Sequence, residues 1–245
     1  GKCAELPEFK GYTDCIIEKT PEFANFLNVI SSRVVGIRLG IVDRTVDNML
    51  KVTTDGRKAA LDLRLVDGNM SFTTQSKVFR CAENVYGIYE KYNSERLTQI
   101  IFCDVSTPKS NFNVYDELQR LLLAFGIPAD EIAYIHDAAT EKKRTELFEK
   151  TRKGEVRILL GSTFKLGTGV NVQDRLIAIH HIDVPWRPAD MVQREGRILR
   201  QGNENKDVEI YRYITEGSFD AYSWQLLESK QKVISGIFSG NADRI

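Results

Sequence analysis

The sequence predicts an α/β fold in which a mostly parallel β-sheet is sandwiched by helices, with a largely helical extension at the N-terminus. From Lys77 onward, short segments rich in Ile, Val and Tyr alternate with amphipathic segments at helical spacing. This alternation is typical of βαβ units, whose strands are parallel. Before residue 76 no such period is found. We therefore expect a linking extension over residues 1–75, the main domain over residues 76–235 and a tail over residues 236–245.

The extension contains two segments of helical character. A helix is expected over residues 23–30, followed by a stretch interrupted by glycines, and a second helix over residues 57–66. Asp67 and Gly68 end the second helix, because both residue types favour turns over helix interiors.

The main domain is predicted to alternate between helices and strands along its whole length. Strands are expected over residues 98–105, 131–137, 156–161, 176–184 and 207–215. Helices are expected over residues 77–92, 114–126 and 140–154, in the arginine-rich segment after residue 190, and from Ser218 onward. The last helix carries Phe219, Tyr222, Leu226 and Val233 at helical spacing, which predicts that it packs on its own domain.

Composition is that of an ordinary globular chain, with 42% hydrophobic and 28% charged residues among 245. The formal net charge is zero, so a polyanionic partner would have to meet a local basic patch. The four cysteines show no C-x-x-C spacing, so we expect no metal site and reduced thiols, as in a cytoplasmic protein. No segment is apolar for long enough to cross a bilayer. The sequence begins with Gly1 and not with Met, which suggests a processed or excised fragment.

Functional side chains are expected where the predicted strands end, because parallel α/β sheets bind ligands at the carboxyl ends of their strands. These positions follow Val105, Gly161 and Val184. After Gly161, the run STFKLGTGVNVQ contains Gly167 and Gly169, which let a backbone approach a ligand closely. Its hydroxyl and amide side chains offer hydrogen bonds. The run therefore predicts a ligand-binding loop.

The segment QREGRILRQGN predicts a helix with a cationic face. Gln193, Arg197 and Arg200 share one side at helical spacing, whereas apolar residues fall on the other. Paired guanidinium groups suit phosphate or carboxylate ligands, because each presents a planar fork of N–H donors. The alternative is an ordinary solvated face whose arginines form ion pairs.

Several positions around these motifs allow more than one interpretation. Trp186 and Arg187 follow a predicted strand; an aromatic ring beside a cation suits nucleic acid, while a buried anchor is the alternative for Trp186. His180 and His181 point to opposite faces of that strand and are expected to pack and form hydrogen bonds. Arg144 suits either a helix-surface ion pair or a phosphate contact.

Taken in order, the runs IIFCDVSTP, LLGSTFKLGTGVNVQ, HHIDVPWRPADMVQREGRILRQGN and VEIYRYITEGSFDAY resemble the C-terminal RecA-like domain of superfamily-two helicases. Among these helicases, the chain is most similar to the Swi/Snf type of DNA translocase, over about residues 76–235. A narrower likeness reaches back to about Asp47 through DNMLKVTTDGRKAALDLRLVD. It is to the helicase regions of phage and mobile-element proteins that also carry an adenine-specific DNA methyltransferase.

The resemblance implies a RecA-like, P-loop NTPase-type fold that serves ATP-driven movement on double-stranded DNA in a bacterial or phage-encoded cytoplasmic protein. In this family ATP binds between two RecA-like domains, and the second domain supplies arginine fingers, which match Arg197 and Arg200. Other positions at the nucleotide are matched by Gln193, Gly167, Gly169 and Asn171. Positions that would contact the DNA backbone are matched by Ser106, Thr107, Ser162, Thr163, Lys165 and Arg187.

Some parts of such a motor are missing from this sequence or changed. No G-x-x-x-x-G-K-[ST] loop and no suitably placed acidic pair are found, so ATP and Mg²⁺ are expected to be held mainly by an N-terminal RecA-like domain of the same polypeptide. The chain alone is therefore not expected to hydrolyse ATP. Lys165, Arg187 and Asn203 replace residues usual in the chromatin remodellers, which affects the DNA contacts and not the arginines. A linked DNA methyltransferase is a further expected partner.

Two alternatives stay open. The first is a non-catalytic DNA- or protein-binding module, which the intact arginine set disfavours. The second is part of an adenine-specific DNA methyltransferase, because DVPW at residues 183–186 resembles the Asp-Pro-Pro-aromatic loop of such enzymes. Val184 interrupts that motif, and no loop for its cofactor is evident.

Overall fold

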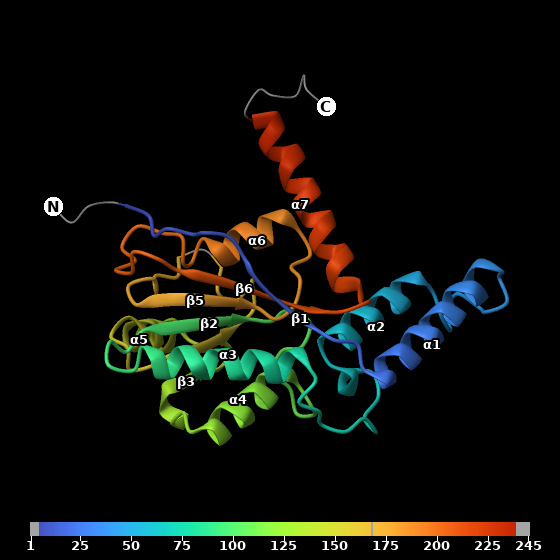
Figure 1. The fold of residues 1–245 in the computed structure, drawn as a ribbon, viewed down its shortest axis with the longest axis horizontal. Coiled ribbons are helices and arrows are strands. Elements are labelled where there is room, and N and C mark those ends of the chain that lie inside the picture. Colours follow the sequence, from blue (N-terminus) through green and yellow to red (C-terminus); the bar gives the residue numbers. More distant parts are fainter. Residues whose placement is uncertain (1–4, 168, 239–245) are drawn as a thin grey trace.

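The structure is a computed structural model that describes residues 5–167 and 169–238. Its centre is a six-stranded sheet with the strand order β1-β6-β5-β2-β4-β3, in which all neighbouring strands are parallel (Figure 1). The strands are β1 (Thr13–Ile17), β2 (Thr98–Phe102), β3 (Ile132–Tyr134), β4 (Ile158–Gly161), β5 (Leu176–His181) and β6 (Glu209–Thr215). The predicted α/β fold with a parallel sheet is confirmed.

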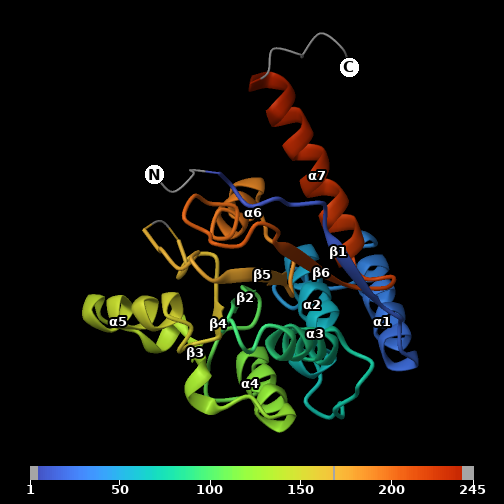
Figure 2. The same cartoon turned by 60° about the vertical axis from the view of Figure 1, so that its left-hand side comes forward.

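Helices and loops cover both faces of this sheet. α3 (Lys77–Lys91) and α4 (Val114–Phe125) pack on one face with Ile101 and Leu160, and α5 (Glu141–Arg152) packs on the other with Ile100 and Leu159. Neighbouring strand residues thus enter opposite cores, as the alternation of side chains along a strand requires. Figure 2 shows α3 and α4 on one side of the sheet and α6 (Pro188–Glu195) on the other.

The helices α3, α4 and α5 begin where the sequence predicts, because each is preceded by a capping side chain. The Ser76 hydroxyl accepts from the Phe79 amide at 3.1 Å, and the Asn113 side chain accepts from the Asp116 amide at 2.9 Å. Thr140 caps α5 in the same way. Side-chain acceptors at this position satisfy amides that have no partner within the helix.

The predicted strand over residues 131–137 is shorter in the structure. Of this segment, only the three residues of β3 form a strand, and they pair with β4. Two short 3₁₀ helices flank β3, η2 (Ala129–Glu131) and η3 (Ile135–Asp137). The pairing ends there because the backbone turns into η3 directly after Tyr134.

The N-terminal extension is largely helical, as predicted, but it also supplies a strand. It contains α1 (Pro21–Arg38), α2 (Met49–Leu61) and η1 (Leu63–Leu65), which lie beside the sheet in Figure 1. β1 pairs along its length with β6, with Ile17 opposite Thr215. The sequence pattern did not predict this strand. The boundary at residue 76 therefore separates two sequence patterns, and as a domain boundary it stays a prediction.

Capping also explains why α2 differs from the helix expected over residues 57–66. It begins earlier because the Asn48 side chain accepts from the Lys51 amide at 3.0 Å. It ends at Leu61 because the Asp62 carboxylate accepts from the Arg64 amide at 2.9 Å and starts η1.

The last helix, α7 (Phe219–Phe238), extends away from the sheet (Figure 1). Asp220, Trp224 and Leu227 are its buried side chains, whereas Tyr222, Leu226 and Val233 are exposed. The helix packs on its own domain, as predicted, but through Trp224 and Leu227 and not through Tyr222, Leu226 and Val233. None of the helices in the described part of the chain has the length and apolar character that a membrane span requires.

Candidate functional site

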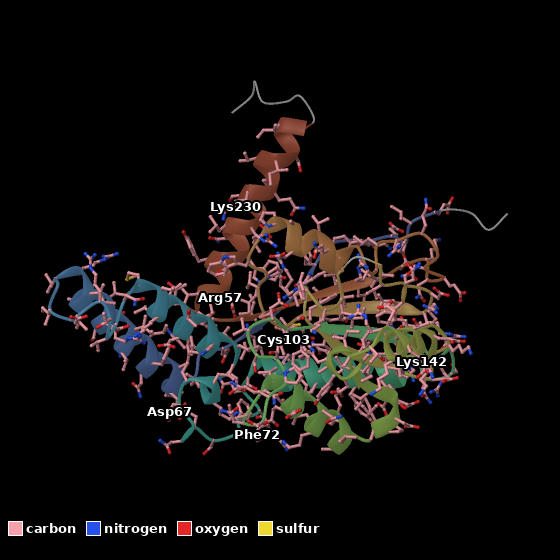
Figure 3. The ribbon with its side chains drawn as sticks, turned by 180° about the vertical axis from the view of Figure 1, so that it is seen from behind. Arg57, Asp67, Phe72, Cys103, Lys142 and Lys230 are labelled. Carbon is pink, nitrogen blue, oxygen red and sulfur yellow. The ribbon has the colours of Figure 1, made fainter. Side chains whose placement is uncertain are left out.

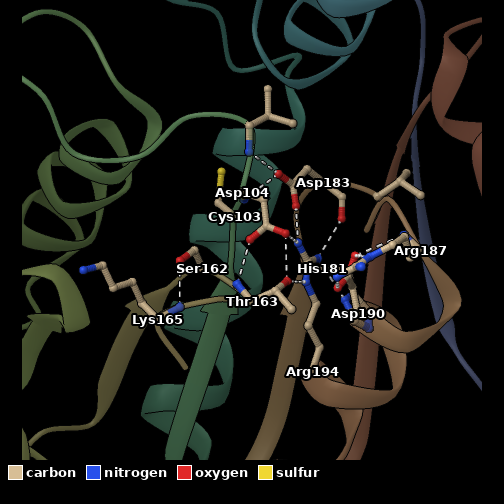
Figure 4. Close-up of polar contacts among 12 residues, drawn as sticks. Cys103, Asp104, Ser162, Thr163, Lys165, His181, Asp183, Arg187, Asp190 and Arg194 are labelled. Carbon is tan, nitrogen blue, oxygen red and sulfur yellow. Dashed lines mark hydrogen bonds and ion pairs between the residues drawn. The ribbon is translucent and has the colours of Figure 1, made fainter. Parts of the chain in front are cut away.

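Arg194 is fully buried at the carboxyl ends of β2, β4 and β5 (Figure 4). Its Nε donates to Thr163 Oγ1 at 2.8 Å, and its Nη2 donates to Asp183 Oδ1 at 2.8 Å. The same Nη2 lies 2.9 Å from Asp104 Oδ2. Its Nη1 donates to the Asp183 carbonyl oxygen at 3.0 Å and contacts His181 Nδ1 at 3.2 Å. One guanidinium thus pairs with two carboxylates inside the fold, which compensates its charge.

The two carboxylates also hold the loops that follow the strands. Asp183 Oδ2 accepts from the backbone amides of Asp104 at 2.6 Å and Val105 at 2.7 Å. Asp104 accepts from the amide and the hydroxyl of Thr163, each at 2.7 Å. The segments after β2, β4 and β5 are therefore joined to one another and, through Arg194, to α6.

The pKa values in this network follow from the pairing of charges. Burial opposes the charge of Arg194, but Asp183 and Asp104 raise the pKa of its guanidinium above the usual value. Burial also opposes the charge of Asp104, yet Arg194 and the hydrogen bonds from Thr163 hold the pKa of that carboxyl below its usual value. Both groups are thus charged in the folded protein.

Arg197 and Arg200 point to a different place, the glycine loop after β4. Arg197 Nη1 donates to the carbonyl oxygens of Gly167 at 3.1 Å and Val170 at 3.0 Å, and Arg200 Nη1 donates to Val170 at 3.1 Å. Within the described part of the chain, neither arginine forms an ion pair. Burial and the neighbouring charge of Arg200 lower the pKa of Arg197. Two cations therefore lie side by side on neutral acceptors.

The predicted helix through these arginines is wrong in its length. α6 ends at Glu195, and the residues that follow form turns. Arg197 and Arg200 therefore reach the loop from a turn, and helical spacing does not explain their common direction. Gln193 lies within α6 and is half-buried, and its backbone carbonyl accepts from Arg197 Nε at 3.3 Å.

The glycine loop is brought against the arginines by these bonds. Gly169 is exposed and has a φ of 90°, a conformation that favours glycine. Asn171 is exposed at the end of the loop, and its backbone carbonyl accepts from Arg152 Nη1 at 2.7 Å. The structure thus places Gly167 and Gly169 beside Arg197, and their assignment to a nucleotide stays a prediction.

Three of the residues predicted to contact DNA are buried. Ser106 Oγ accepts from the Val114 amide at 3.0 Å, and Ser162 Oγ accepts from the Lys165 amide at 3.2 Å. Thr163 is held between Asp104 and Arg194, as described above. These hydroxyls are used within the fold, so in this conformation they stabilise loops and do not face a phosphate backbone.

The other three predicted DNA residues reach the surface. Lys165 and Arg187 are exposed, and Thr107 is half-buried. Arg187 forms an ion pair with Asp190, with Nη2 at 3.0 Å from Oδ1, which compensates part of its charge. Arg144 forms no ion pair with a described residue; its Nη2 donates to the Lys165 carbonyl oxygen at 3.2 Å.

Trp186 is 60% exposed, so its interpretation as a buried anchor is wrong. His180 and His181, in contrast, are fully buried in β5, as expected of packing residues. His180 contacts the Tyr213 hydroxyl at 2.9 Å and Gln99 Oε1 at 2.8 Å. Burial lowers the pKa of His180 to about 3. In the described residues, no group of three or more His, Cys, Asp and Glu side chains is arranged to hold a metal ion.

Comparison with known families agrees with this geometry. Residues 82–202 match the family model described as the helicase conserved C-terminal domain, a segment that includes the buried network, the glycine loop and both arginines. This segment therefore matches the helicase C-terminal family. The predicted likeness to a helicase C-terminal domain is therefore confirmed.

Curated relatives of this helicase domain match over shorter segments. The chain is 38% identical over 73 residues to the defense against restriction protein B of Escherichia phage P1, which covers 30% of the chain and 3% of that protein. It is 32% identical over 115 residues to the putative ATP-dependent helicase/translocase YwqA of Bacillus subtilis (strain 168), which covers 46% of the chain and 12% of that protein. The helicase domain thus matches only a small part of each relative.

Among solved structures, the C-terminal part of the Fun30 ATPase domain is similar, with a TM-score of 0.50 and 21% sequence identity. The match covers 66% of this chain and 49% of that chain. This likeness shows that the helicase domain has the RecA-like fold.

Sequence reasoning missed two arginines of this region, Arg194 and Arg57. Arg194 shares helical spacing with Met191 and Ile198, which are both buried. A charge on an apolar stripe indicates a buried, paired charge, and this signal could have identified Arg194. Arg57 contacts Trp186, which lies far along the chain, so the local sequence held no signal for it.

Proposed function

We propose that this chain is the second motor domain of an ATP-dependent DNA helicase or translocase of the Swi/Snf type. It acts with ATP, Mg²⁺ and double-stranded DNA, and Arg197 and Arg200 are its arginine fingers. An N-terminal RecA-like domain of the same polypeptide completes the ATP site, so the chain alone does not hydrolyse ATP. A linked adenine-specific DNA methyltransferase and a cytoplasmic location in a bacterial or phage-infected cell are further predictions.

The observation that carries this proposal is the difference in charge compensation among neighbouring arginines. Arg194 pairs with two carboxylates, whereas among the described residues Arg197 and Arg200 donate only to backbone carbonyl oxygens. A carbonyl oxygen satisfies an N–H donor but leaves the positive charge uncompensated. A phosphate would supply the missing charge, and hydrogen bonds between charged groups are roughly twice as strong as neutral ones. Arginines in this state are suited to stabilise charge on a phosphoryl group.

Four residues around these arginines fit the nucleotide site that we propose. Gly167 and Gly169 leave the backbone of the loop accessible, Asn171 is exposed at its end, and Gln193 lies in α6, four residues before Arg197. In the complete site, Mg²⁺ would neutralise charge between the phosphates of ATP. The residues of this chain would bind and orient the nucleotide from the side opposite the N-terminal domain.

For the DNA contact we propose that Lys165, Thr107 and Arg187 meet the phosphate backbone, since these side chains reach the surface. The buried hydroxyls of Ser106, Ser162 and Thr163 act indirectly, because they hold the loops from which the exposed residues project. Contacts to phosphates fix the position of a strand without reading its sequence.

The test measures DNA-stimulated ATP hydrolysis and duplex-DNA affinity of the full-length protein. Arg200→Ala and Arg197→Ala are expected to lower the hydrolysis rate on the order of a thousandfold, because loss of an arginine finger removes charge stabilisation from the reacting phosphoryl group. Duplex affinity should be retained. Arg38→Ala is the matched control, because Arg38 is exposed on α1 and its loss changes the net charge equally.

Two results would contradict the proposal. A wild-type hydrolysis rate in Arg200→Ala would make Arg200 an ordinary surface residue. Hydrolysis of ATP by the isolated chain would contradict a site shared with a second domain.

A further inference from the structure

Arg57 of α2 reaches from the helical extension to the loop after β5. Its guanidinium carbon lies 4.5 Å from the centroid of the Trp186 ring, and its Nη2 donates to the Val184 carbonyl oxygen at 3.1 Å. The guanidinium therefore lies over the indole and also binds the backbone two residues before it. Two contacts from one planar group restrict the directions that the ring can take.

Arg57 is itself held in place, because α2 is closely packed at this point. A Cβ atom added to Gly56 would lie 1.8 Å from Phe219 Cε2, so α2 and the start of α7 approach more closely than any larger residue would permit. Thr215 Oγ1 at the end of β6 also donates to the Ala60 carbonyl oxygen at 2.7 Å. Figure 3 shows Arg57 at this junction, beside the base of α7.

The charge of Arg57 is uncompensated. Within the part of the chain that the structure describes, Arg57 forms no ion pair, whereas Arg187, next to Trp186 in the sequence, pairs with Asp190. The exposed ring of Trp186 therefore lies against an arginine whose charge has no carboxylate partner. An accessible aromatic ring combined with a free cation suits nucleic acid, because the ring can contact a base or sugar while the cation meets a phosphate.

We propose that Arg57 contacts duplex DNA and also positions Trp186, so that the helical extension and the loop after β5 form one DNA-binding surface. This inference rests on the proposed function, because it assumes that the domain binds duplex DNA. It assigns a DNA-binding role to the extension, and it makes Arg57 a stronger phosphate contact than Arg187.

The test measures the duplex-DNA affinity of the full-length protein at several salt concentrations. Arg57→Ala should weaken binding about tenfold and reduce the slope of log K against log salt by about 0.9, because one phosphate contact is lost. Arg57→Lys should keep the slope but lose part of the affinity, because a lysine keeps the charge without the planar stacking group. Trp186→Ala should also weaken binding at an unchanged slope. Arg38→Ala, the matched control on α1, should change neither quantity.

A double variant tests the positioning role. If Arg57 orients Trp186, the losses from Arg57→Ala and Trp186→Ala should be less than additive, because part of the effect of Arg57 acts through the ring. Fully additive losses would overturn the positioning role. Should Arg57→Ala fail to fold, Arg57→Lys decides the point, and wild-type affinity in that variant would contradict a stacking role.

The inference and the proposed function fail in different ways. Wild-type affinity and salt slope in Arg57→Ala, with normal binding by the wild-type protein, would overturn the role of Arg57 alone. Failure of the wild-type protein to bind duplex DNA would overturn the proposed function.

Discussion

Replacing Arg194 with alanine should be among the most destabilising changes in this chain. The substitution removes the only cation that is shown to pair with both Asp183 and Asp104 in the described residues. Breaking a buried ion pair by removing one partner costs roughly 3–5 kcal/mol of unfolding free energy. The Asp183 side chain is 4% exposed and should bear that cost, whereas the Asp104 side chain is 30% exposed and can regain water. We therefore expect a loss of about 3 kcal/mol, near the lower end of that range.

Equilibrium unfolding in urea measures this loss. Fluorescence of Trp224 is a suitable probe, because this buried ring lies 5.4 Å from the ring of His181 beside the network. A loss of about 3 kcal/mol should move the midpoint by roughly 1–3 M urea for a chain with an ordinary denaturant slope. Arg197→Ala is the control: it removes hydrogen bonds to neutral carbonyl oxygens and should cost only about 1 kcal/mol.

The pH dependence gives a second test of the same network. The folded pKa of Asp104 is held below its usual 3.8, so its contribution to stability is present above that value and is lost as the pH falls through the folded pKa. This acid-dependent loss should shrink in Arg194→Ala. At neutral pH, a loss of unfolding free energy below about 1 kcal/mol on Arg194→Ala would refute the reasoning. Such a result would mean that Asp183 and Asp104 find other partners or are solvated.

Two further predictions concern burial elsewhere in the fold. His180 has a folded pKa of about 3 against an ordinary 6.5, so the unfolding free energy should fall as the pH drops from 6.5 toward 3. His180→Gln cannot take up a proton, so urea titrations of this variant across that pH range should show a smaller fall. Gly56→Ala should cost roughly 1–3 kcal/mol of unfolding free energy, because Phe219 must move. Gly87→Ala in α3, where a Cβ meets nothing within 4 Å, should be neutral or stabilising. Equal effects of the two changes on the melting temperature would contradict the close packing of α2 on α7.

The sheet could be predicted from the sequence because its inner strands are covered on both faces. β2, β4 and β5 are buried throughout, and each contains an apolar run, IIF, ILL and LIAI, between helical segments. β1 carries no such signal, because it is an edge strand with an exposed Ile16 and a partly exposed Asp14. Its partner β6 lies at the other end of the chain, and the Asp14–Arg212 pair spans 198 positions. Local patterns do not contain that information.

The α6 region shows a different limit. Helical spacing placed Gln193, Arg197 and Arg200 on one face, but the helix ends at Glu195. The arginines nevertheless reach a common loop, because the turn and the carbonyl oxygens of the loop direct them. The residues of the site were thus predicted from a family pattern, whereas the reason given for their common direction was wrong.

Whether an arginine can bind an anionic ligand depends on which groups compensate its charge, and the local sequence around the arginine does not predict those groups. Arg194 and Arg197 are three residues apart in one motif, yet the first pairs with carboxylates from two strand ends and the second meets only carbonyl oxygens. Arg187 pairs within its own helix start, whereas Arg57 has no ion-pair partner among the described residues. Releasing Arg194 would leave two carboxylates unpaired, while releasing Arg197 from its carbonyl oxygens exposes no unpaired charge. Arg194 is therefore suited to hold the loops in place, whereas Arg197, Arg200 and Arg57 can each exchange a neutral contact for an anion.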